Sequence, residues 1–357
     1  MSIVETTQPQ RPVSLRAGTV DRIRADRPLH VAILAYGGMV MLLLHATGTS
    51  QAAAFASYVP VWSVAFFFVF PVLYAGWRVL AVVHRVDRRR RLAWRAVFPA
   101  GRIDAMAAGV PLLATLMVFQ GAFTSFKAAM PIWRGGFVHD AIQADIDRFL
   151  HMGVDPWRWL FSLSDAYWLQ RAVEISYSQI WFVFCFGFLF WVVVSPAAAG
   201  IRTRYLVAYV ATWIVVGNLL ALVFLSAGPA YFGLVTGDHA RFAEQLAILS
   251  RSAGVAHSAV ELQAYLWASH EGRVAGLGTG ISAFPSMHVA LATLNMLFLW
   301  ERSRRWGMIA AGYLLVVLAS SVYLAWHYAI DGYAAIALVA AIHFGLRAAM
   351  KPALKAS

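Results

Sequence analysis

The sequence predicts an all-α, polytopic membrane helical bundle, and three observations carry this prediction. Of the 357 residues, 61% are hydrophobic and only 13% are charged, whereas a soluble domain has about 25% charged residues. The apolar residues gather into runs long enough to cross a bilayer core of ~30 Å, which takes roughly 20 helical residues. The basic residues fall in short clusters between these runs, as the positive-inside rule describes for cytoplasmic loops.

About eight stretches qualify as spans. They cover approximately 31–49, 58–80, 103–124, 178–199, 205–226, 286–301, 307–326 and 332–349. With eight spans, the basic clusters at 84–95, 202–204, 302–305 and 347–355 share one side of the membrane with the basic N-terminal segment. That side is expected to be the cytoplasm, and both termini are then cytoplasmic.

The chain is expected to fold as a single unit with short additions. We expect a disordered cytoplasmic tail at 1–29, two accessory spans with a basic cytoplasmic loop at 30–100, a six-helix core at 101–350 and a short cytoplasmic tail at 351–357. The outer connection 125–177 is rich in Asp and Trp and predicts amphipathic helices at the membrane interface. A glycine-rich stretch, 272–280, predicts a turn that approaches another segment closely.

The charge and cysteine content exclude several classes of protein. The net charge of +12 does not indicate a nucleic-acid partner, because the basic residues sit between apolar runs and form no aromatic-rich basic face. The bilayer is the expected partner. The single cysteine, Cys185, excludes an intrachain disulfide and a cysteine-based zinc site.

Two histidine segments stand out among eleven histidines. Pro285-Ser286-Met287-His288 lies at the outer entrance of the sixth span, where Pro285 would occupy the first helical turn and leave the following amides free for an anion. A serine N-cap with a packed histidine is the alternative. His327 and Asp331, at the outer end of the seventh span, would share a helical face. The carboxylate would then orient the imidazole and leave its other nitrogen as nucleophile or base. A simple interfacial hydrogen bond is the alternative.

Two outer cations complete the set. Lys127 and Arg134 follow the third span, on the side that the positive-inside rule leaves poor in cations, so a phosphate ligand would account for them. Snorkelling at the interface is the alternative. All three segments lie at outer ends of spans and can converge at one membrane–water boundary.

The three segments resemble the motifs of the type 2 phosphatidic acid phosphatase superfamily, which are Lys-x6-Arg-Pro, Pro-Ser-Gly-His and Ser-Arg-x5-His-x3-Asp. The resemblance covers about the C-terminal two-thirds of the chain. Three positions depart from the pattern, namely Gly135, Met287 and Ser321. The sequence is closest in motif to the inositol phosphorylceramide synthase (inositolphosphotransferase) branch, which carries Phe-Pro-Ser-x-His and Tyr-Leu-x-x-His-Tyr-x-x-Asp, as in Tyr323 to Asp331 here.

The resemblance implies roles for each residue. His327 would be the nucleophile that forms a phosphohistidine, Asp331 would orient it, and His288 would be the acid and then the base. Lys127, Arg134, Ser286 and the amide of Met287 would hold the phosphoryl oxygens, with Arg273 and Ser321 as possible further contacts. The family needs no metal, and the sequence offers no ligand cluster that calls for a metal or another cofactor.

The expected function is therefore a membrane lipid phosphatase or phosphotransferase at the outer face, acting on a lipid phosphate and passing the phosphoryl group to water or to an alcohol such as a polyol. An isoprenyl diphosphate phosphatase is an alternative, and a non-catalytic membrane scaffold or a transporter is an alternative of another class. We expect the cytoplasmic (inner) membrane of a bacterium, with the site on the periplasmic side.

Overall fold

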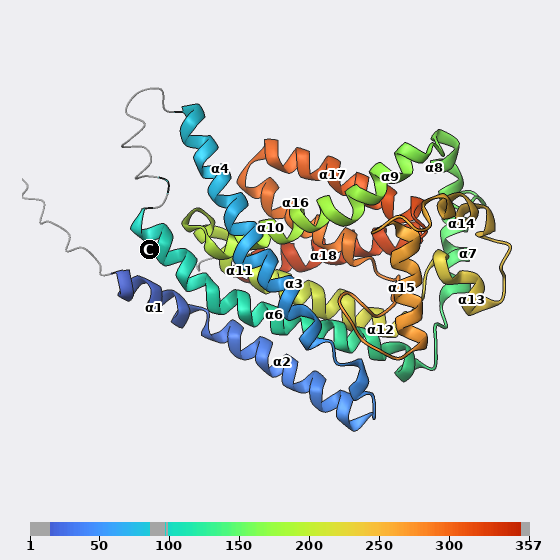
Figure 1. The fold of residues 1–357 in the computed structure, drawn as a ribbon, viewed down its shortest axis with the longest axis horizontal. Helices are drawn as coiled ribbons and strands as arrows, with labels where there is room; N and C mark the ends of the chain where they lie inside the picture. The colour runs from blue at the N-terminus through green and yellow to red at the C-terminus, as the bar shows by residue number, and fades with distance from the viewer. Residues whose placement is uncertain (1–14, 86–96, 98, 351–357) are drawn as a thin grey trace, which may run out of the picture.

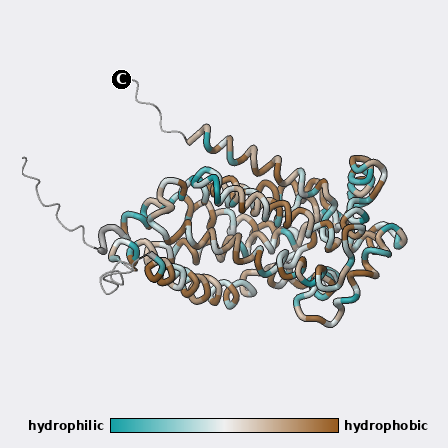
Figure 2. The backbone as a smooth tube through the Cα atoms, turned by 90° about the horizontal axis from the view of Figure 1, so that it is seen from above, coloured by the Kyte–Doolittle hydropathy of each residue, from teal (hydrophilic) through white to brown (hydrophobic). Residues whose placement is uncertain are grey.

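The computed structural model describes residues 15–85, 97 and 99–350, and all regular structure in these ranges is helical (Figure 1). Seven helices among the described residues are long and apolar enough to cross a membrane. The all-α architecture of a membrane protein is therefore confirmed. Figure 2 shows mostly hydrophobic helices through the middle of the bundle, with hydrophilic residues gathered toward its two ends.

The helices form four consecutive groups. The first is α1 (Leu15–Ala25), α2 (Arg27–Ala46), α3 (Phe55–Val64) and α4 (Phe70–Arg85). The second is α6 (Ala100–Arg134), α7 (Asp140–Leu150), α8 (Trp157–Leu163) and α9 (Tyr167–Ile175). The third is α10 (Trp181–Val194), α11 (Ala199–Ala211), α12 (Ala221–Val223), α13 (Phe232–Thr236), α14 (Ala243–Leu249) and α15 (Ala259–Glu271). The last is α16 (Met287–Arg302), α17 (Arg304–Tyr323) and α18 (Ala329–Ala349).

Three π-helical segments join neighbouring helices into longer spans. Ala65–Val69 joins α3 to α4, Ser176–Ile180 joins α9 to α10, and Thr212–Leu220 joins α11 to α12. A π-helical turn widens the helix locally and occurs often at functional sites. The second of these segments carries a side chain of the candidate site, as described below.

Helix α16 is the expected sixth span, and it is not one of the seven. Its 16 residues rise about 24 Å at ~1.5 Å per residue, which is short of a ~30 Å bilayer core. It lies in the centre of the bundle, where Val289, Leu294 and Phe298 are fully buried. A helix enclosed by other helices does not have to match the thickness of the bilayer, so the expected count of eight spans is not confirmed.

The two accessory spans belong to the same bundle, because they pack along α6 (Figure 1). Gly121 of α6 permits a close approach: an added Cβ there would lie 2.9 Å from the Cα of Phe55 in α3. The Trp62 indole N–H of α3 donates to the carbonyl of Leu113 in α6, at 2.9 Å. A buried indole that keeps its hydrogen bond fixes α3 both laterally and along the axis of α6.

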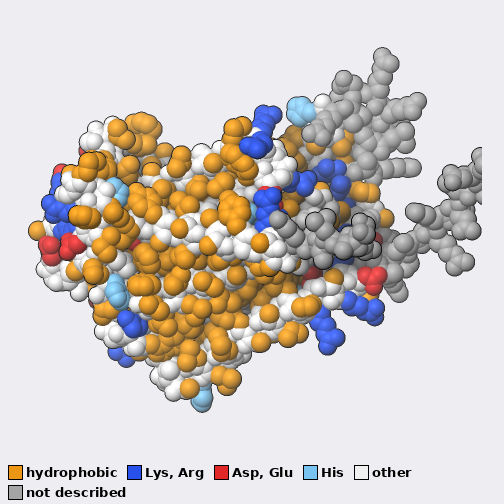
Figure 3. Space-filling model, turned by 180° about the vertical axis from the view of Figure 1, so that it is seen from behind, with side chains coloured by type: hydrophobic (Ala, Val, Ile, Leu, Met, Phe, Trp, Pro, Cys, Tyr) orange, Lys and Arg blue, Asp and Glu red, His pale blue; other side chains and the backbone are white. Residues whose placement is uncertain are grey.

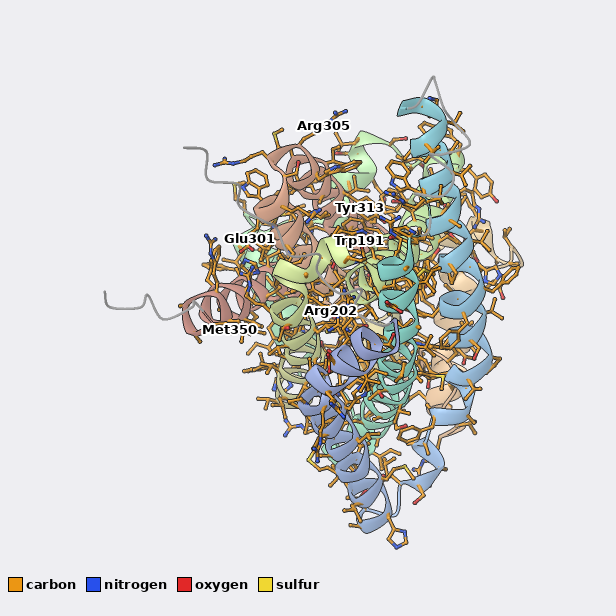
Figure 4. All side chains as sticks on the ribbon, turned by 90° about the vertical axis from the view of Figure 1, so that its left-hand side faces the viewer. Trp191, Arg202, Glu301, Arg305, Tyr313 and Met350 are labelled. Atoms are coloured by element: carbon orange, nitrogen blue, oxygen red, sulfur yellow. The ribbon has the colours of Figure 1, made fainter. Side chains whose placement is uncertain are left out.

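One end of the bundle gathers the basic residues expected on the cytoplasmic side. Arg202, Glu301, Arg305 and Met350 lie toward this end in Figure 4. Residues 15–25 of the expected disordered tail form α1. Asp26, which follows α1, accepts hydrogen bonds from the two terminal guanidinium nitrogens of Arg202. The remaining tail residues 1–14, the basic residues 86–96 and the tail 351–357 lie outside the described residues. The side of the membrane on which this end lies stays a prediction.

The opposite end carries α7, α8 and α13–α15 (Figure 1). Helix α7 is amphipathic in the sense expected of an interfacial helix. Ile142, Ile146 and Phe149 are exposed, whereas Asp140 and Asp147 are buried against the bundle. Figure 3 shows a broad apolar belt across the molecule with charged side chains toward both ends. The polar face of α7 therefore packs against the protein interior, and its apolar face is exposed where it can contact lipid.

Candidate active site

His327 and Asp331 meet in the turn between α17 and α18. Asp331 lies in the first turn of α18, and its Oδ2 accepts hydrogen bonds from His327 Nδ1 (3.2 Å) and from the Tyr328 amide (3.0 Å). Because a carboxylate only accepts, Nδ1 carries the proton and Nε2 keeps its lone pair. The two residues do not share the helical face that their spacing predicted. The two side chains meet instead because Tyr328 is the N-cap of α18 and His327 lies in the turn before it.

The turn that carries His327 is held from several directions. The carbonyl of Ser321 accepts the amides of Trp326 (3.0 Å) and His327 (3.1 Å), while its hydroxyl donates to the Leu318 carbonyl (2.7 Å). Ser321 was a possible phosphate ligand. Its hydroxyl instead makes a hydrogen bond within α17, and its carbonyl holds the backbone of His327, the candidate nucleophile.

The start of α16 lies beside this turn. Ser286 is the N-cap: its hydroxyl accepts the amide of Val289 (3.4 Å), and its own amide donates to the carbonyl of Asp331 (3.1 Å). Pro285 therefore precedes the cap, and the expectation that it occupies the first turn is wrong. The Ser286 amide is also not free, because it ties α16 to α18. The amides of Met287 and His288 are in the first turn, where an α-helix has no internal acceptor for them.

His288 is enclosed by two aromatic rings. Its imidazole stacks on Tyr177 of the π-helical segment, with ring centroids 4.2 Å apart, and on Trp181 of α10, at 4.0 Å. The Trp181 indole N–H donates to the His288 carbonyl at 3.0 Å. These contacts hold the ring in one orientation and shield it from water. Neither ring could be assigned to the site from the sequence, since Tyr177 and Trp181 belong to no motif.

Lys127 is the cation of the site. It lies on α6, where the glycine-rich stretch presses against it: a Cβ added at Gly280, whose φ is +90°, would come within 2.8 Å of the Lys127 carbonyl carbon. This confirms the close approach expected of the glycines. Among the described residues, Lys127 makes no hydrogen bond or ion pair that would neutralise its charge. Its ammonium is therefore available for an anionic ligand.

Lys127, His288 and His327 line one cavity of about 250 Å³, which we call the histidine cavity. Ser282, Met287 and Tyr177 contribute to the same wall. Burial, together with the nearby charge of Lys127, lowers the pKa of His327 to about 3. The ring is therefore neutral near pH 7, the state in which an imidazole can attack.

Two predicted cations lie outside the histidine cavity. Arg134, at the end of α6, is exposed, and its guanidinium donates to the Val223 carbonyl at 3.5 Å. Arg273 lines a separate hollow between α6 and the glycine-rich stretch and has a positive φ of 51°. Among the described residues that line the histidine cavity, Lys127 is the only lysine or arginine.

Two carboxylates of α7 were missed as parts of the site. Asp140 accepts the amides of Ala227 (2.7 Å) and Gly228 (2.8 Å) and the hydroxyl of Tyr328 (2.8 Å). Burial raises the pKa of Asp140, and these three donors oppose the rise. Asp147 accepts the first amides of α18, from Ile330 (3.0 Å) and Ala329 (3.2 Å). Both carboxylates therefore fix the segment that carries His327 and Asp331. Only their seven-residue spacing, which places them on one helical face, could have indicated this.

Two glutamines of the second outer connection hold the same segment. Gln245 of α14 donates to the carbonyls of Val322 (2.8 Å) and Tyr323 (3.2 Å), and Gln263 of α15 donates to the Leu324 carbonyl (2.9 Å). These carbonyls lie at the C-terminal end of α17, where the helix itself offers few amide donors. Side chains of both outer connections therefore hold this turn by hydrogen bonds.

The described residues of this helical membrane protein thus place two histidines, a buried carboxylate and a lysine at one site. A model of the PAP2 (type 2 phosphatidic acid phosphatase) superfamily matches residues 143–345, more than half of the chain. The chain belongs to this superfamily. No curated protein and no solved structure gave a significant match.

Proposed function

We propose that the protein transfers the phosphoryl group of a lipid phosphate ester through a phosphohistidine on His327. The observation that carries this proposal is a single one. An imidazole oriented by a buried carboxylate, a second imidazole and an unpaired ammonium all face the same 250 Å³ cavity. Membership of the PAP2 superfamily supports the activity class.

The reaction would proceed in two displacements. In the first, His327 Nε2 attacks phosphorus, the N–P bond forms, and the P–O bond to the lipid alcohol breaks as His288 gives its proton to the departing oxygen. In the second, His288 takes a proton from water or another alcohol, whose oxygen attacks phosphorus and releases His327. Lys127 and the Met287 and His288 amides would stabilise the charge on the phosphoryl oxygens.

One cation in the cavity favours a substrate with one negative charge at phosphorus. A phosphate monoester carries up to two charges and a diester carries one. Since Arg134 and Arg273 lie elsewhere and Ser321 replaces an arginine, the balance suits a phosphodiester donor and transfer to an alcohol. This agrees with the resemblance of residues 323–331 to the inositolphosphotransferase branch. We therefore propose transfer from a diester as the finer function, with hydrolysis of a monoester as the second candidate.

The test is an activity panel on the full chain purified in detergent. Phosphatidate, an isoprenyl diphosphate and phosphatidylinositol would be offered, each with and without an added polyol or long-chain alcohol. Wild type would be compared with His327→Ala, with His288→Ala and with His45→Ala, a matched control because His45 is exposed at the end of α2.

Each outcome assigns a function. Headgroup exchange without free phosphate, lost in the first two variants and kept in the control, supports transfer from a diester. Free phosphate from phosphatidate or from the diphosphate with the same mutant pattern supports the phosphatase. No turnover of any lipid by wild type would contradict both and favour the non-catalytic scaffold. We further propose that the site faces the periplasm of a bacterium, which an impermeant lipid substrate added to intact cells would test.

A further inference from the structure

A second cavity, of about 280 Å³, adjoins the histidine cavity, and we call it the aromatic chamber. The two cavities share Lys127, Met287, His288, Leu277 and Gly278. His327 lines the histidine cavity only. The chamber therefore meets the site at the proposed acid and away from the proposed nucleophile.

The walls of the chamber are mostly apolar and come mainly from predicted spans. Seven Tyr, Trp and Phe side chains from α3, α6, α10 and the π-helical segment after α11 contribute to it: Tyr58, Trp62, Phe123, Trp181, Phe182, Phe186 and Trp213. The polar side chains of the wall are largely engaged within the protein. Tyr58 bonds to Thr124, Gln120 donates to Tyr209, and Trp62 donates to a carbonyl. Such a wall offers contact area to an apolar ligand and presents few free hydrogen-bonding groups.

The size of the chamber points to a chain as its guest. A single water needs a cavity of about 10–15 Å³. The 280 Å³ of the chamber is therefore far larger than a site for isolated waters. Val61 of α3 lines the chamber and is 41% exposed on the surface of a span. The chamber therefore reaches the lipid-facing side of the bundle at Val61, where a hydrocarbon can enter from the bilayer.

We propose that the aromatic chamber holds the hydrocarbon of the alcohol that leaves phosphorus. This rests on the proposed function. The oxygen that leaves phosphorus takes its proton from His288, and the group bonded to that oxygen must extend from His288 away from His327. The chamber is the space that satisfies both conditions. The polar remainder of the substrate would stay in the histidine cavity.

The accessory helix α3 would contribute to substrate binding. Val61, Trp62 and Ala65 supply one wall of the chamber, and they lie outside the matched residues 143–345. The N-terminal spans would then set which hydrocarbon chains are accepted. The two histidines of the proposed chemistry, His288 and His327, would remain in the matched region.

The test narrows the chamber without touching the site. Val61→Trp places a large ring at the mouth, and Val64→Trp is the matched control, because Val64 lies one turn away, is 57% exposed and does not line the chamber. Butyl and octyl esters of the phosphate class that wild type is found to turn over would be compared as soluble monomers. For Val61→Trp we expect kcat/KM to fall about tenfold or more on the octyl ester, roughly the contribution of two buried methylenes, and to stay within about twofold on the butyl ester. The control should match wild type on both.

A second measurement does not depend on turnover. A hexadecanol with a mid-chain diazirine would be photolysed with the full chain, and labelled peptides would be mapped by mass spectrometry. We expect label on α3 and α6 around the chamber in wild type and equally in His327→Ala, lost in Val61→Trp and kept in Val64→Trp. Label in the chamber without any turnover would contradict the proposed function alone. Turnover with equal losses on both esters, or with no label in the chamber, would overturn the chamber proposal alone.

Discussion

Gly228 gives the sharpest test of how the site is positioned. It lies in the connection after α12, with φ +97° and ψ 171°, a region that is essentially restricted to glycine. Its amide donates to Asp140 at 2.8 Å. A Cβ added here would lie 2.6 Å from the carbonyl oxygen of Trp326, the residue before His327. Gly228→Ala therefore pushes on the backbone of the proposed nucleophile.

The size of the effect follows from these distances. To move from 2.6 Å to the 3.4 Å at which ordinary contact begins, the backbone must shift by about 0.8 Å. The backbone strain alone costs about 1–3 kcal/mol. A misplacement of ~1 Å at a reacting group can lower the rate about 10²-fold. We therefore expect Gly228→Ala to lose stability and, in addition, about 10²-fold in kcat/KM.

Gly237→Ala is the matched control. Gly237 also has a positive φ, +82°, but nothing lies within 4 Å of an added Cβ. It should lose stability through strain alone and keep its activity at a temperature where it remains folded. Melting temperature and kcat/KM would be measured for both variants in the same detergent. Equal activities of the two variants would refute the reasoning, because the contact with Trp326 would then have no consequence.

Three further predictions concern individual side chains. For Asp147→Asn, whose carboxylate accepts two amides at the start of α18, we expect a loss of about 1–3 kcal/mol in stability and lower activity, whereas Asp145→Asn, on the exposed side of α7, should change the melting temperature less. The pKa of His327 is lowered from 6.5 to about 3. In the pH window between these two values, the imidazole binds a proton in the unfolded chain and not in the folded one. Wild type should therefore lose more stability than His327→Gln as the pH falls through the window, and parallel melting curves would contradict the burial of a neutral ring. For His288→Ala we expect a 10²–10⁴-fold loss on an alkyl ester and a much smaller loss on a nitrophenyl ester, whose leaving oxygen needs no proton. Equal losses on both esters would exclude His288 as the acid.

The residues proposed to bear the chemistry could be picked out from the sequence, because their types and spacings are unusual at the ends of apolar runs. His327 with Asp331 and His288 with Ser286 do come together, and Lys127 joins them. The local geometry could not be predicted. A motif with proline before serine is compatible with either residue as the first of the helix. The extended backbone of Ser286 and the hydrogen bond from the Val289 amide to its hydroxyl show that the cap is Ser286.

Long-range partners left no pattern in the sequence. Asp140, Asp147 and Gln245 reach segments roughly 80 to 190 residues away, and the same residue types are common on exposed interfacial helices. For Arg134, the sequence pattern indicated a contact that the structure does not contain. Its spacing from Lys127 indicated a shared ligand, but α6 ends at Arg134 and leaves its side chain exposed. Helix α16 matches the predicted stretch 286–301, but its enclosure by neighbouring helices could not be predicted, since enclosure depends on the whole bundle.

The central claim is that His327 carries the phosphoryl group during the reaction. The direct measurement is to quench wild type within the first turnover of a phosphorus-labelled lipid substrate and map the bound phosphate by mass spectrometry under alkaline conditions, where phosphohistidine survives. We predict an acid-labile phosphate on the peptide that contains His327, absent in His327→Ala and unaffected in His45→Ala. An active wild type that carries no such phosphate, or carries it on another residue, would contradict the mechanism.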